Sequence, residues 1–201
     1  MQGIVLISGS GSNLQAIIDT CVDIDLNIAC VISNNADAYG LVRANQANIN
    51  TQIIEHTNYP SRDAFDTDLA KLIDQYDPEI IILAGFMRIL TPEFTKKYLG
   101  KMLNIHPSLL PKFQGLNTHQ RALDAGETEH GVSVHFVTDE LDGGPVIAQA
   151  RVKVLDNDNA ESLAKRVLAE EHKLFPKVIH WFTQKRLTLE NNHALLDGKT
   201  L

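Results

Sequence analysis

The chain has 201 residues, of which 44% are hydrophobic and 21% are charged, and its formal net charge is -7. This length suits one domain with its own core, and the composition is ordinary for globular proteins, which excludes a disordered or fibrous chain. The acidic balance argues against a general nucleic-acid or anionic-membrane binder, because such proteins need a basic face.

The N-terminal half alternates short β-branched runs with longer segments of helical periodicity. Extended segments are predicted at residues 3–7, 28–32, 52–54 and 80–83, and helices at residues 14–20, 41–47 and 65–76. This alternation predicts an α/β fold with a mostly parallel central sheet flanked by helices. Because residues 80–84 are continuously apolar, we expect their strand near the centre of the sheet, buried on both faces.

The C-terminal half predicts a mixed sheet, because its extended segments are separated mainly by loops. These segments are residues 102–105, 132–137 and 146–154. In the second of them, Ser133 and His135 share one face, which therefore carries a hydroxyl and an imidazole. No repeat, low-complexity tract or linker marks a boundary, and we expect a single domain over residues 1–201.

The last long helix is expected to begin near Asp158 and Asn159 and to run to about Phe182. Asp158 and Glu161 have the spacing of a capping box. Pro176 lies within the predicted helix and should kink it, because proline removes one backbone hydrogen bond. The apolar stripe of this helix consists of Leu163, Val167, Leu174, Val178 and Trp181.

A turn rich in glycine and serine, residues 8–14, stands between the first predicted strand and the first predicted helix. Glycine lets the backbone approach a ligand closely, and the free N–H groups of a helix start favour an anion. The turn lacks the lysine of a Walker loop, and Leu14 stands where a dinucleotide-binding motif has its last glycine. The turn is therefore a candidate anion site, although a capped turn without a ligand has the same pattern.

Residues 103–111 form an apolar strand that carries two polar side chains and ends at a proline. Because residues two apart in a strand point to the same side, Asn104 and His106 can converge on one point. The amide can donate to a developing oxyanion, and the imidazole can donate or shuttle a proton. A polar strand end satisfied by its own hydrogen bonds is the structural alternative.

An acidic loop with paired glycines, residues 138–145, connects two predicted strands. Its carboxylates would ordinarily lie in a solvated turn. The Gly-Gly-Pro sequence at its end constrains the backbone, however, and a carboxylate held against His106 would favour the imidazolium. A plain hairpin turn remains the alternative for this loop.

The eight histidines do not have the spacing of metal ligands. Neither H-E-x-x-H nor a zinc-ribbon pattern occurs, so we expect no metal. We interpret five of them as surface or capping residues, namely His56, His130, His172, His180 and His193. Cys21 and Cys30 form no disulfide framework, and the apolar N-terminal run is too short for a signal peptide or a membrane span, so we expect a cytoplasmic protein.

These motifs occur together, and in this order the chain resembles the folate-dependent formyltransferase family. The resemblance spans residues 7–16, 83–90, 103–111, 130–137 and 139–145. It implies a Rossmann-like fold and an enzyme of purine biosynthesis that transfers the formyl group of 10-formyltetrahydrofolate, a cosubstrate. The implied acceptor is the amine of a small molecule, glycinamide ribonucleotide, and no metal takes part.

By this resemblance, Asn104, His106 and Asp142 form the catalytic set. His106 is expected to act as general acid, Asn104 to stabilise the oxyanion, and Asp142 to keep His106 protonated. These roles suit the reaction, because attack of a neutral amine on the formyl carbon creates a tetrahedral centre with separated charge. Protons must then move from the amine nitrogen to the leaving folate nitrogen.

The resemblance also implies which residues bind the ribonucleotide. Gly11, Ser12 and Asn13 are assigned to its phosphate, and Glu171 to its ribose portion. Helical periodicity alone does not choose between Glu170 and Glu171, because both flank the apolar stripe of the last helix. The ribose contact therefore rests on the resemblance. Leu168, a few residues earlier, stands where relatives can carry a polar group.

For the folate, the resemblance implies an apolar wall and an acidic loop around the reacting centre. The residues are Arg62, Met87, Arg88, Ile89, Leu90, Asn104, Asp139, Glu140, Leu141 and Asp142. An apolar wall with a few convergent polar groups is what a flat pterin requires. Arg62 and Arg88 are candidate cations for the carboxylate tail of the folate, or else ordinary surface charges.

Three other functions fit part of the pattern. A formyltetrahydrofolate deformylase or a methionyl-tRNA formyltransferase would use the same three catalytic residues, but we expect the former to carry an extra N-terminal domain and the latter a C-terminal domain and a basic surface. A non-catalytic nucleotide- or folate-binding module would leave the catalytic set without a purpose. We therefore expect a small-molecule enzyme, monomeric or homodimeric, that binds neither nucleic acid nor membrane.

Overall fold

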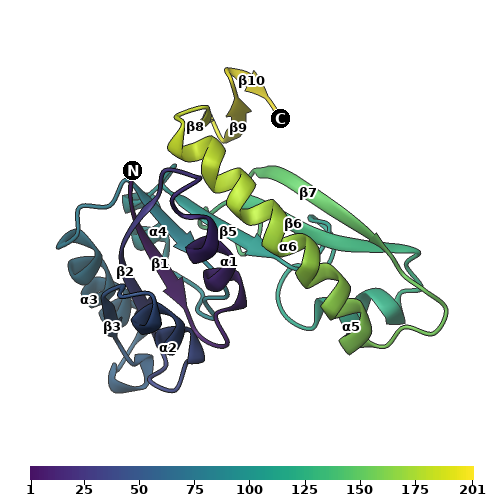
Figure 1. Ribbon diagram of the computed structural model, residues 1–201, viewed down its shortest axis with the longest axis horizontal. Coiled ribbons are helices and arrows are strands. Elements are labelled where there is room, and N and C mark those ends of the chain that lie inside the picture. The colour runs from purple at the N-terminus through teal and green to yellow at the C-terminus, as the bar shows by residue number, and fades with distance from the viewer.

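The computed structural model describes all 201 residues and contains a seven-stranded and a three-stranded sheet (Figure 1). The order of the large sheet is β3-β2-β1-β4-β5-β6-β7. Its strands are β1 (Gln2–Ile7), β2 (Asn27–Ser33), β3 (Thr51–Ile53), β4 (Ile80–Leu83), β5 (Met102–His106), β6 (Glu129–Phe136) and β7 (Val146–Lys153). Strands β1 to β5 pair in parallel, whereas β6 and β7 are antiparallel to their neighbours. The predicted α/β class, with a mixed C-terminal half, is confirmed.

Helices cover both faces of this sheet. They are α1 (Ser12–Thr20), α2 (Tyr39–Gln46), α3 (Arg62–Asp74), α4 (Pro92–Lys97), α5 (Thr118–Asp124) and α6 (Ala160–Thr183), with a 3-10 turn at His56–Asn58. The long helix α6 runs across one face with α1 beside it (Figure 1). None of the helices, α6 included, is long and apolar enough to cross a membrane.

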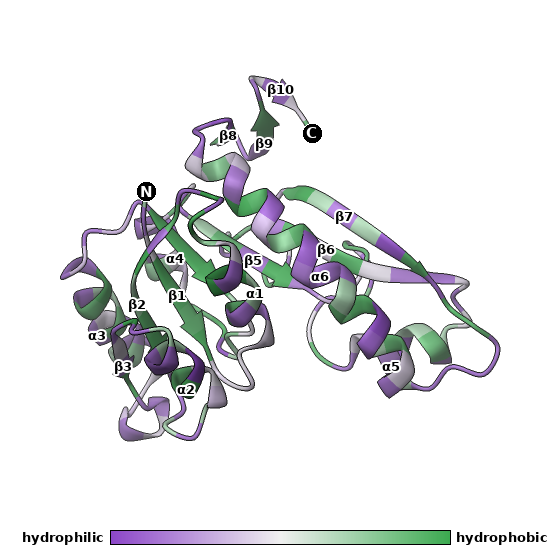
Figure 2. Ribbon diagram, in the orientation of Figure 1, coloured by the Kyte–Doolittle hydropathy of each residue, from purple (hydrophilic) through white to green (hydrophobic).

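Two apolar cores lie on the two faces, and the alternation of strand residues supplies both of them. In β1, Val5 and Ile7 belong to the core beneath α1, α2 and α6, whereas Ile4 and Leu6 belong to the core beneath α3 and α4. Each such fully buried side chain contributes about 1.5–3 kcal/mol to stability. Figure 2 shows the central strands as the most hydrophobic part of the ribbon. The strand predicted at the sheet centre, β4, is the middle strand and is buried throughout.

The helix α6 begins with a different cap from the predicted one. Asn159 Oδ1 accepts the Ser162 N–H at 2.8 Å, and Ser162 Oγ accepts the Asn159 N–H at 3.0 Å. The prediction of a box between Asp158 and Glu161 is therefore wrong by one residue. Asp158 instead forms an ion pair with Arg166 at 2.7 Å, because it lies in the turn before the helix rather than at the cap.

Several short elements were not predicted from the sequence. They are α4, α5 and the small antiparallel sheet of β8 (Leu187–Glu190), β9 (His193–Leu196) and β10 (Lys199–Thr200). None is long enough to show a clear hydrophobic period. The start of α4 nevertheless has a recognisable signal, because Thr91 caps it and Pro92 occupies its first turn.

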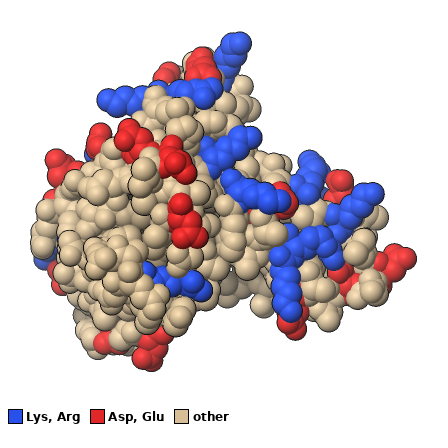
Figure 3. Space-filling view, viewed as in Figure 1, with Lys and Arg blue, Asp and Glu red and all other residues tan.

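The surface carries both signs of charge. On the face shown in Figure 3, side chains of both signs occur, with the basic ones gathered mainly on the right. Ion pairs of the protein include Arg151–Glu129 at 3.1 Å and Lys165–Glu161 at 2.7 Å. Exposed pairs of this kind contribute little to stability.

The parallel pairing of β1, β4 and β5 brings three loops to one edge of the sheet. The carboxyl ends of these strands are followed by residues 8–13, residues 85–91 and the segment that begins at Pro107. In open α/β sheets, ligands bind at this edge. The candidate site residues of the first half and of the second half therefore meet here.

Candidate active site

His106 ends β5 and is buried between a carbonyl group and a carboxylate. Its Nε2 lies 2.9 Å from the carbonyl oxygen of Phe113. Because a carbonyl only accepts hydrogen bonds, Nε2 carries a proton and donates it to Phe113. The other ring nitrogen, Nδ1, lies 3.3 Å from Asp142 Oδ2. The protonation of Nδ1 therefore decides whether the pair is ionic.

Asp142 lies inward, with its side chain 11% exposed, although it belongs to an acidic loop. Its φ is 49°, in the left-handed region, and its Oδ2 also accepts the Gly115 N–H at 2.9 Å. The loop can press against β6 because a Cβ at Gly144 would lie 1.9 Å from the Phe136 carbonyl oxygen, so only glycine fits there. The second glycine of the pair noted in the sequence therefore has a structural cause.

Asn104 contacts the same carboxylate and, in addition, His135. Its Nδ2 lies 3.5 Å from Asp142 Oδ1 and 3.1 Å from His135 Nε2. His135 Nδ1 lies 2.8 Å from the Phe136 carbonyl oxygen and donates to it, which leaves Nε2 as the acceptor of the neutral ring. One N–H of Asn104 is thereby committed to His135. The second lies toward Asp142 Oδ1, and because this contact is long it can be exchanged for a hydrogen bond to an oxyanion formed beside it.

His135 is a site residue that no motif of the sequence predicts. It is 2% exposed, and burial lowers its pKa, which favours the neutral ring that the hydrogen bonds require. The strand pattern placed its imidazole on a polar face. The pairing of β5 with β6 sets it directly opposite Asn104, and this register cannot be obtained from either strand alone.

These groups form part of the lining of a cleft with a volume of about 760 Å³. All ten residues assigned to the folate line it: Arg62, Met87, Arg88, Ile89, Leu90, Asn104, Asp139, Glu140, Leu141 and Asp142. Met87 is 65% exposed, and Ile89 and Leu141 are also exposed, so the cleft has an apolar rim. Residues 115–119, which no motif of the sequence predicts to be part of a site, line it as well.

Arg88 is the more enclosed of the two candidate cations. Its guanidinium carbon lies 5.5 Å from the centroid of the Phe65 ring, and its buried Nε has no hydrogen-bond partner. Arg62, at the start of α3, is exposed. Both line the cleft, so each can reach an anionic group bound there.

The proposed anion turn has the geometry of an open helix start. Gly11 precedes α1 with a φ of 69°, and no side chain caps the helix. The N–H groups of the first turn are therefore free for a ligand. A Cβ at Gly11 would lie 2.5 Å from the Gly40 Cα, so this position requires glycine on two counts.

The structure distinguishes the two glutamates of α6. Glu171 is buried, and its Oε2 accepts a hydrogen bond from Asn13 Nδ2 at 2.6 Å. Burial raises the pKa of Glu171. Glu170 instead forms a pair with Lys173 at 2.8 Å on the outside of the helix. Gly11, Ser12, Asn13 and Glu171 do not line the large cleft but lie at the same edge of the sheet.

His130, interpreted from the sequence as a surface or capping residue, is in fact 1% exposed. Its Nε2 lies 3.1 Å from His119 Nδ1, and burial lowers its pKa to about 4. The interpretation is wrong because β6 is buried from its second residue, His130, onward. The His130 ring packs against the rings of Phe113 and His119.

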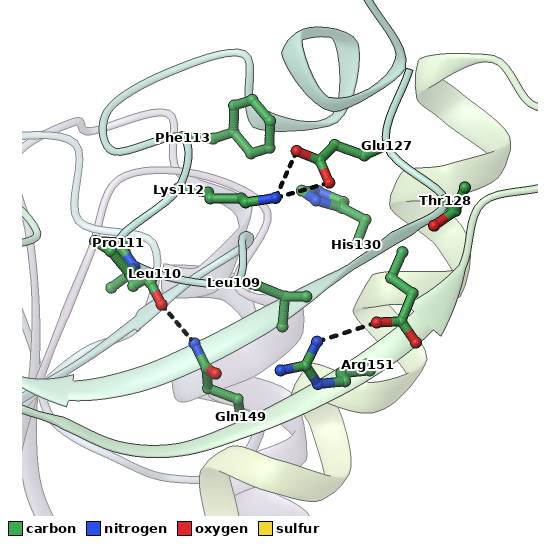
Figure 4. Close-up of a pocket in the computed structure, with 11 residues that line it drawn as sticks. Leu109, Leu110, Pro111, Lys112, Phe113, Glu127, Thr128, His130, Gln149 and Arg151 are labelled. Atoms are coloured by element: carbon green, nitrogen blue, oxygen red, sulfur yellow. Dashed lines mark hydrogen bonds and ion pairs between the residues drawn. The ribbon is translucent and has the colours of Figure 1, made fainter. Parts of the chain in front are cut away.

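A second, smaller cavity of about 260 Å³ lies beside residues 109–113 (Figure 4). Its charged side chains are paired. Lys112 contacts Glu127 at 2.7 Å, and Arg151 contacts Glu129 at 3.1 Å. Gln149 donates to the Leu110 carbonyl oxygen at 2.9 Å. This cavity therefore offers no unpaired charge to a ligand. No three side chains among the His, Cys, Asp and Glu residues are grouped so that they could hold a metal ion.

The fold and the cleft together define the class of the protein. Residues 1–179 match the family model described as formyl transferase, and the chain belongs to this family. The family expected from the sequence is confirmed.

Full-length relatives of the chain include phosphoribosylglycinamide formyltransferases. It is 54% identical to the phosphoribosylglycinamide formyltransferase of Escherichia coli (strain K12), with 100% of this chain and 96% of that protein covered. It is 51% identical to the protein of the same name from Haemophilus influenzae, over 98% and 94% of the two chains. The solved phosphoribosylglycinamide formyltransferase of Coxiella burnetii, in complex with CHES, is 57% identical, with a TM-score of 0.96 over 100% of this chain and 95% of that chain.

Proposed function

We propose that this chain transfers the formyl group of 10-formyltetrahydrofolate to the amine of glycinamide ribonucleotide. The observation that carries the proposal is the cluster in which His106 and Asn104 both face the carboxylate of Asp142, at 3.3 and 3.5 Å. This cluster lines a cleft large enough for a folate, and the chain belongs to the formyl transferase family.

In the proposed reaction, the amine nitrogen attacks the formyl carbon, a C–N bond forms, and the carbonyl electron pair moves to oxygen. The Asn104 N–H that faces Asp142 at 3.5 Å leaves this long contact and donates to the oxyanion. The amine nitrogen loses its proton to water, and the electron pair on the oxyanion returns to re-form the C=O bond. The bond from the formyl carbon to the folate nitrogen breaks as His106 supplies a proton to that nitrogen, and water then returns a proton to His106. Asp142 compensates the positive charge of the imidazolium and so keeps His106 able to donate.

Proton donation by His106 requires an exchange of partners. Nε2–H is bonded to Phe113, and Nδ1 faces Asp142. One of these contacts must give way to the folate nitrogen before a proton can be passed on. Because the Phe113 carbonyl belongs to a loop segment and not to a strand or helix, the bond to this carbonyl is the one that we expect to exchange.

The two substrates are assigned to different elements. The phosphate of the ribonucleotide is proposed to bind the N–H groups of Gly11, Ser12 and Asn13. Glu171, whose pKa is raised by burial, is proposed to bind the ribose hydroxyls. The folate is assigned to the ten cleft residues given above, with the pterin against the apolar wall and Arg62 and Arg88 near its carboxylate tail.

The proposal is tested by mixing the purified protein with 10-formyltetrahydrofolate and following tetrahydrofolate formation by absorbance. We expect release that depends on glycinamide ribonucleotide and stoichiometric formylation of its amine. Release without any acceptor would instead identify a deformylase, and release only with methionyl-tRNA would identify the tRNA enzyme. Binding of both small molecules without turnover would leave the non-catalytic module as the better description.

A further inference from the structure

The segment of residues 87–90, here called the folate wall, has no helix or strand of its own. It is nevertheless held at both ends by side chains from other parts of the chain. At its start, the Met87 N–H donates to Ser8 Oγ at 2.7 Å. Directly after its end, the Thr91 N–H donates to Asp66 Oδ2 at 2.6 Å. These two hydrogen bonds fix the path of the wall, because an irregular segment makes few backbone bonds of its own.

The first of these side chains, Ser8, belongs to the turn that is proposed to bind the ribonucleotide phosphate. Ser8 follows β1 directly and begins the turn that leads to Gly11 and α1. Its N–H donates to the Gly85 carbonyl oxygen at 3.1 Å, so Ser8 and the loop after β4 are bonded in both directions. The nucleotide turn and the folate wall therefore share one residue as a support.

The orientation of the Ser8 hydroxyl is fixed from both sides. It donates to Asn34 Oδ1 at 2.5 Å while it accepts from Met87. Asn34 is itself buried, and its Nδ2 lies 3.2 Å from His56 Nδ1. A hydroxyl with one donor and one acceptor contact cannot rotate freely. A displacement of Ser8 is therefore passed to Met87 and is not absorbed by rotation of the side chain.

The second support, Asp66, has no such connection. It lies on α3, is buried, and has one carboxylate oxygen without a hydrogen-bond partner. Burial raises its pKa, while the charges of Arg88 and Arg62 lower it. None of its contacts reaches the nucleotide turn. The folate wall thus has two supports of similar geometry, of which only Ser8 is continuous with the anion turn.

We propose that Ser8 is a positioning residue that couples the two substrate sites, so that a ribonucleotide on the anion turn increases the affinity for the folate. The inference rests on the proposed function, because its two ligands are the ribonucleotide and the folate of that function. A phosphate bound to Gly11, Ser12 and Asn13 restrains the turn, Ser8 moves with the turn, and the hydroxyl holds Met87 in its place. By linkage, the folate increases the affinity for the ribonucleotide by the same factor.

The coupling is measured as a ratio of dissociation constants. The Kd of tetrahydrofolate, which has no formyl group to transfer, is determined anaerobically by calorimetry with and without saturating glycinamide ribonucleotide. In the wild-type chain we expect the ribonucleotide to lower this Kd by about fivefold or more. In Ser8→Ala the ratio should fall toward one, because the hydroxyl link to Met87 is removed and only the Ser8 N–H bond to the Gly85 carbonyl oxygen remains. Ser8→Gly removes the same hydroxyl and should behave alike, and Ser8→Thr should restore the ratio.

Asp66→Asn is the matched control. It weakens the other support of the folate wall, so the Kd of tetrahydrofolate should rise about fivefold whether or not the ribonucleotide is present. The ratio should then stay at its wild-type value. A purely structural role for Ser8 would give both variants the same pattern.

Three results would overturn the proposal: a wild-type ratio of one, a wild-type ratio retained in Ser8→Ala, or a ratio lost equally in Asp66→Asn. Each of them leaves the catalytic assay of the wild-type chain untouched. Failure of the proposed function would appear differently, as an absence of formyl transfer to glycinamide ribonucleotide by the wild-type protein.

Discussion

The nucleotide side and the folate side of the candidate site are built differently. Gly11, Asn13 and Glu171 lie at or within the regular helices α1 and α6, whose positions are fixed by many apolar contacts. The folate side depends on loops, and its reacting groups are held by a few hydrogen bonds such as that of His106 to Phe113. Activity should therefore depend most on single polar groups on the folate side. On the nucleotide side, substrate binding should depend most on the shape of the backbone.

The largest effect is expected for Asp142→Asn. The substitution keeps the shape of the side chain but removes the charge that faces His106 at 3.3 Å. We expect kcat to fall by about 10²–10⁴-fold, the usual contribution of general acid–base catalysis. The KM for the ribonucleotide should change little, because Asp142 lies outside the anion turn. Steady-state kinetics with each substrate varied in turn measure both values.

Asp139→Asn is the matched control for this experiment. It removes a charge from the same loop, at an exposed residue for which no hydrogen bond to His106 or Asn104 exists. Because Asp139 is assigned to the folate, the KM for the folate should rise, but kcat should fall far less than in Asp142→Asn. If the two variants lose the same activity, the charge of the loop as a whole matters, and the specific contact between Asp142 and His106 does not.

The sequence predicts the features that depend on local patterns, and it does not predict contacts between residues far apart in the chain. Strand period placed Asn104 and His106 on one side of β5, and strand and helix alternation gave the parallel sheet, because both are local patterns. The choice of Glu171 over Glu170 needed the packing of α6 against α1. The contact of His135 with Asn104 and that of Ser8 with Met87 join residues 31 and 79 positions apart. Such contacts depend on sheet register and loop packing, which no local pattern contains.

Acid should lower the free energy of unfolding, because the buried His130 ring resists protonation in the folded chain. Its pKa is lowered from 6.5 to about 4 by burial, so in this interval the unfolded chain binds a proton that the folded chain does not. The free energy of unfolding should therefore decrease as pH falls from 6.5 to about 4, with about 3 kcal/mol due to this ring. Urea unfolding of the wild type and of His130→Gln at pH 7 and pH 4 measures the difference.

Burial also lowers the pKa of His119 and His135, so the wild-type profile alone does not isolate His130. His135 remains in both proteins and its contribution cancels in the difference, whereas His119 contacts His130 at 3.1 Å, so the difference measures this pair of rings. His193→Gln, at an exposed position of β9, should follow the wild-type profile. Parallel pH profiles for the wild type and His130→Gln would show that His130 titrates normally in the folded chain.

On the nucleotide side, Gly11→Val tests the role of backbone shape. Valine disfavours the φ of 69° at this position, and its Cβ would lie 2.5 Å from the Gly40 Cα. The turn must move, and the KM for glycinamide ribonucleotide should rise about tenfold or more, because each lost bond to a phosphate contributes about 1.5–3 kcal/mol. Gly9→Ala is the matched control, since a Cβ there meets nothing within 4 Å. Equal KM values for both variants would move the phosphate site elsewhere.

The smallest effect is expected for His135→Phe, which keeps an aromatic ring but removes the acceptor of the Asn104 N–H at 3.1 Å. The amide of Asn104 then loses the bond that orients it, and we expect kcat to fall about fivefold with both KM values nearly unchanged. His135→Gln, which can accept the same N–H, should recover part of the loss. If kcat is unchanged in His135→Phe, Asp142 alone orients Asn104, and the folate side tolerates the loss of one polar contact as well as the nucleotide side does.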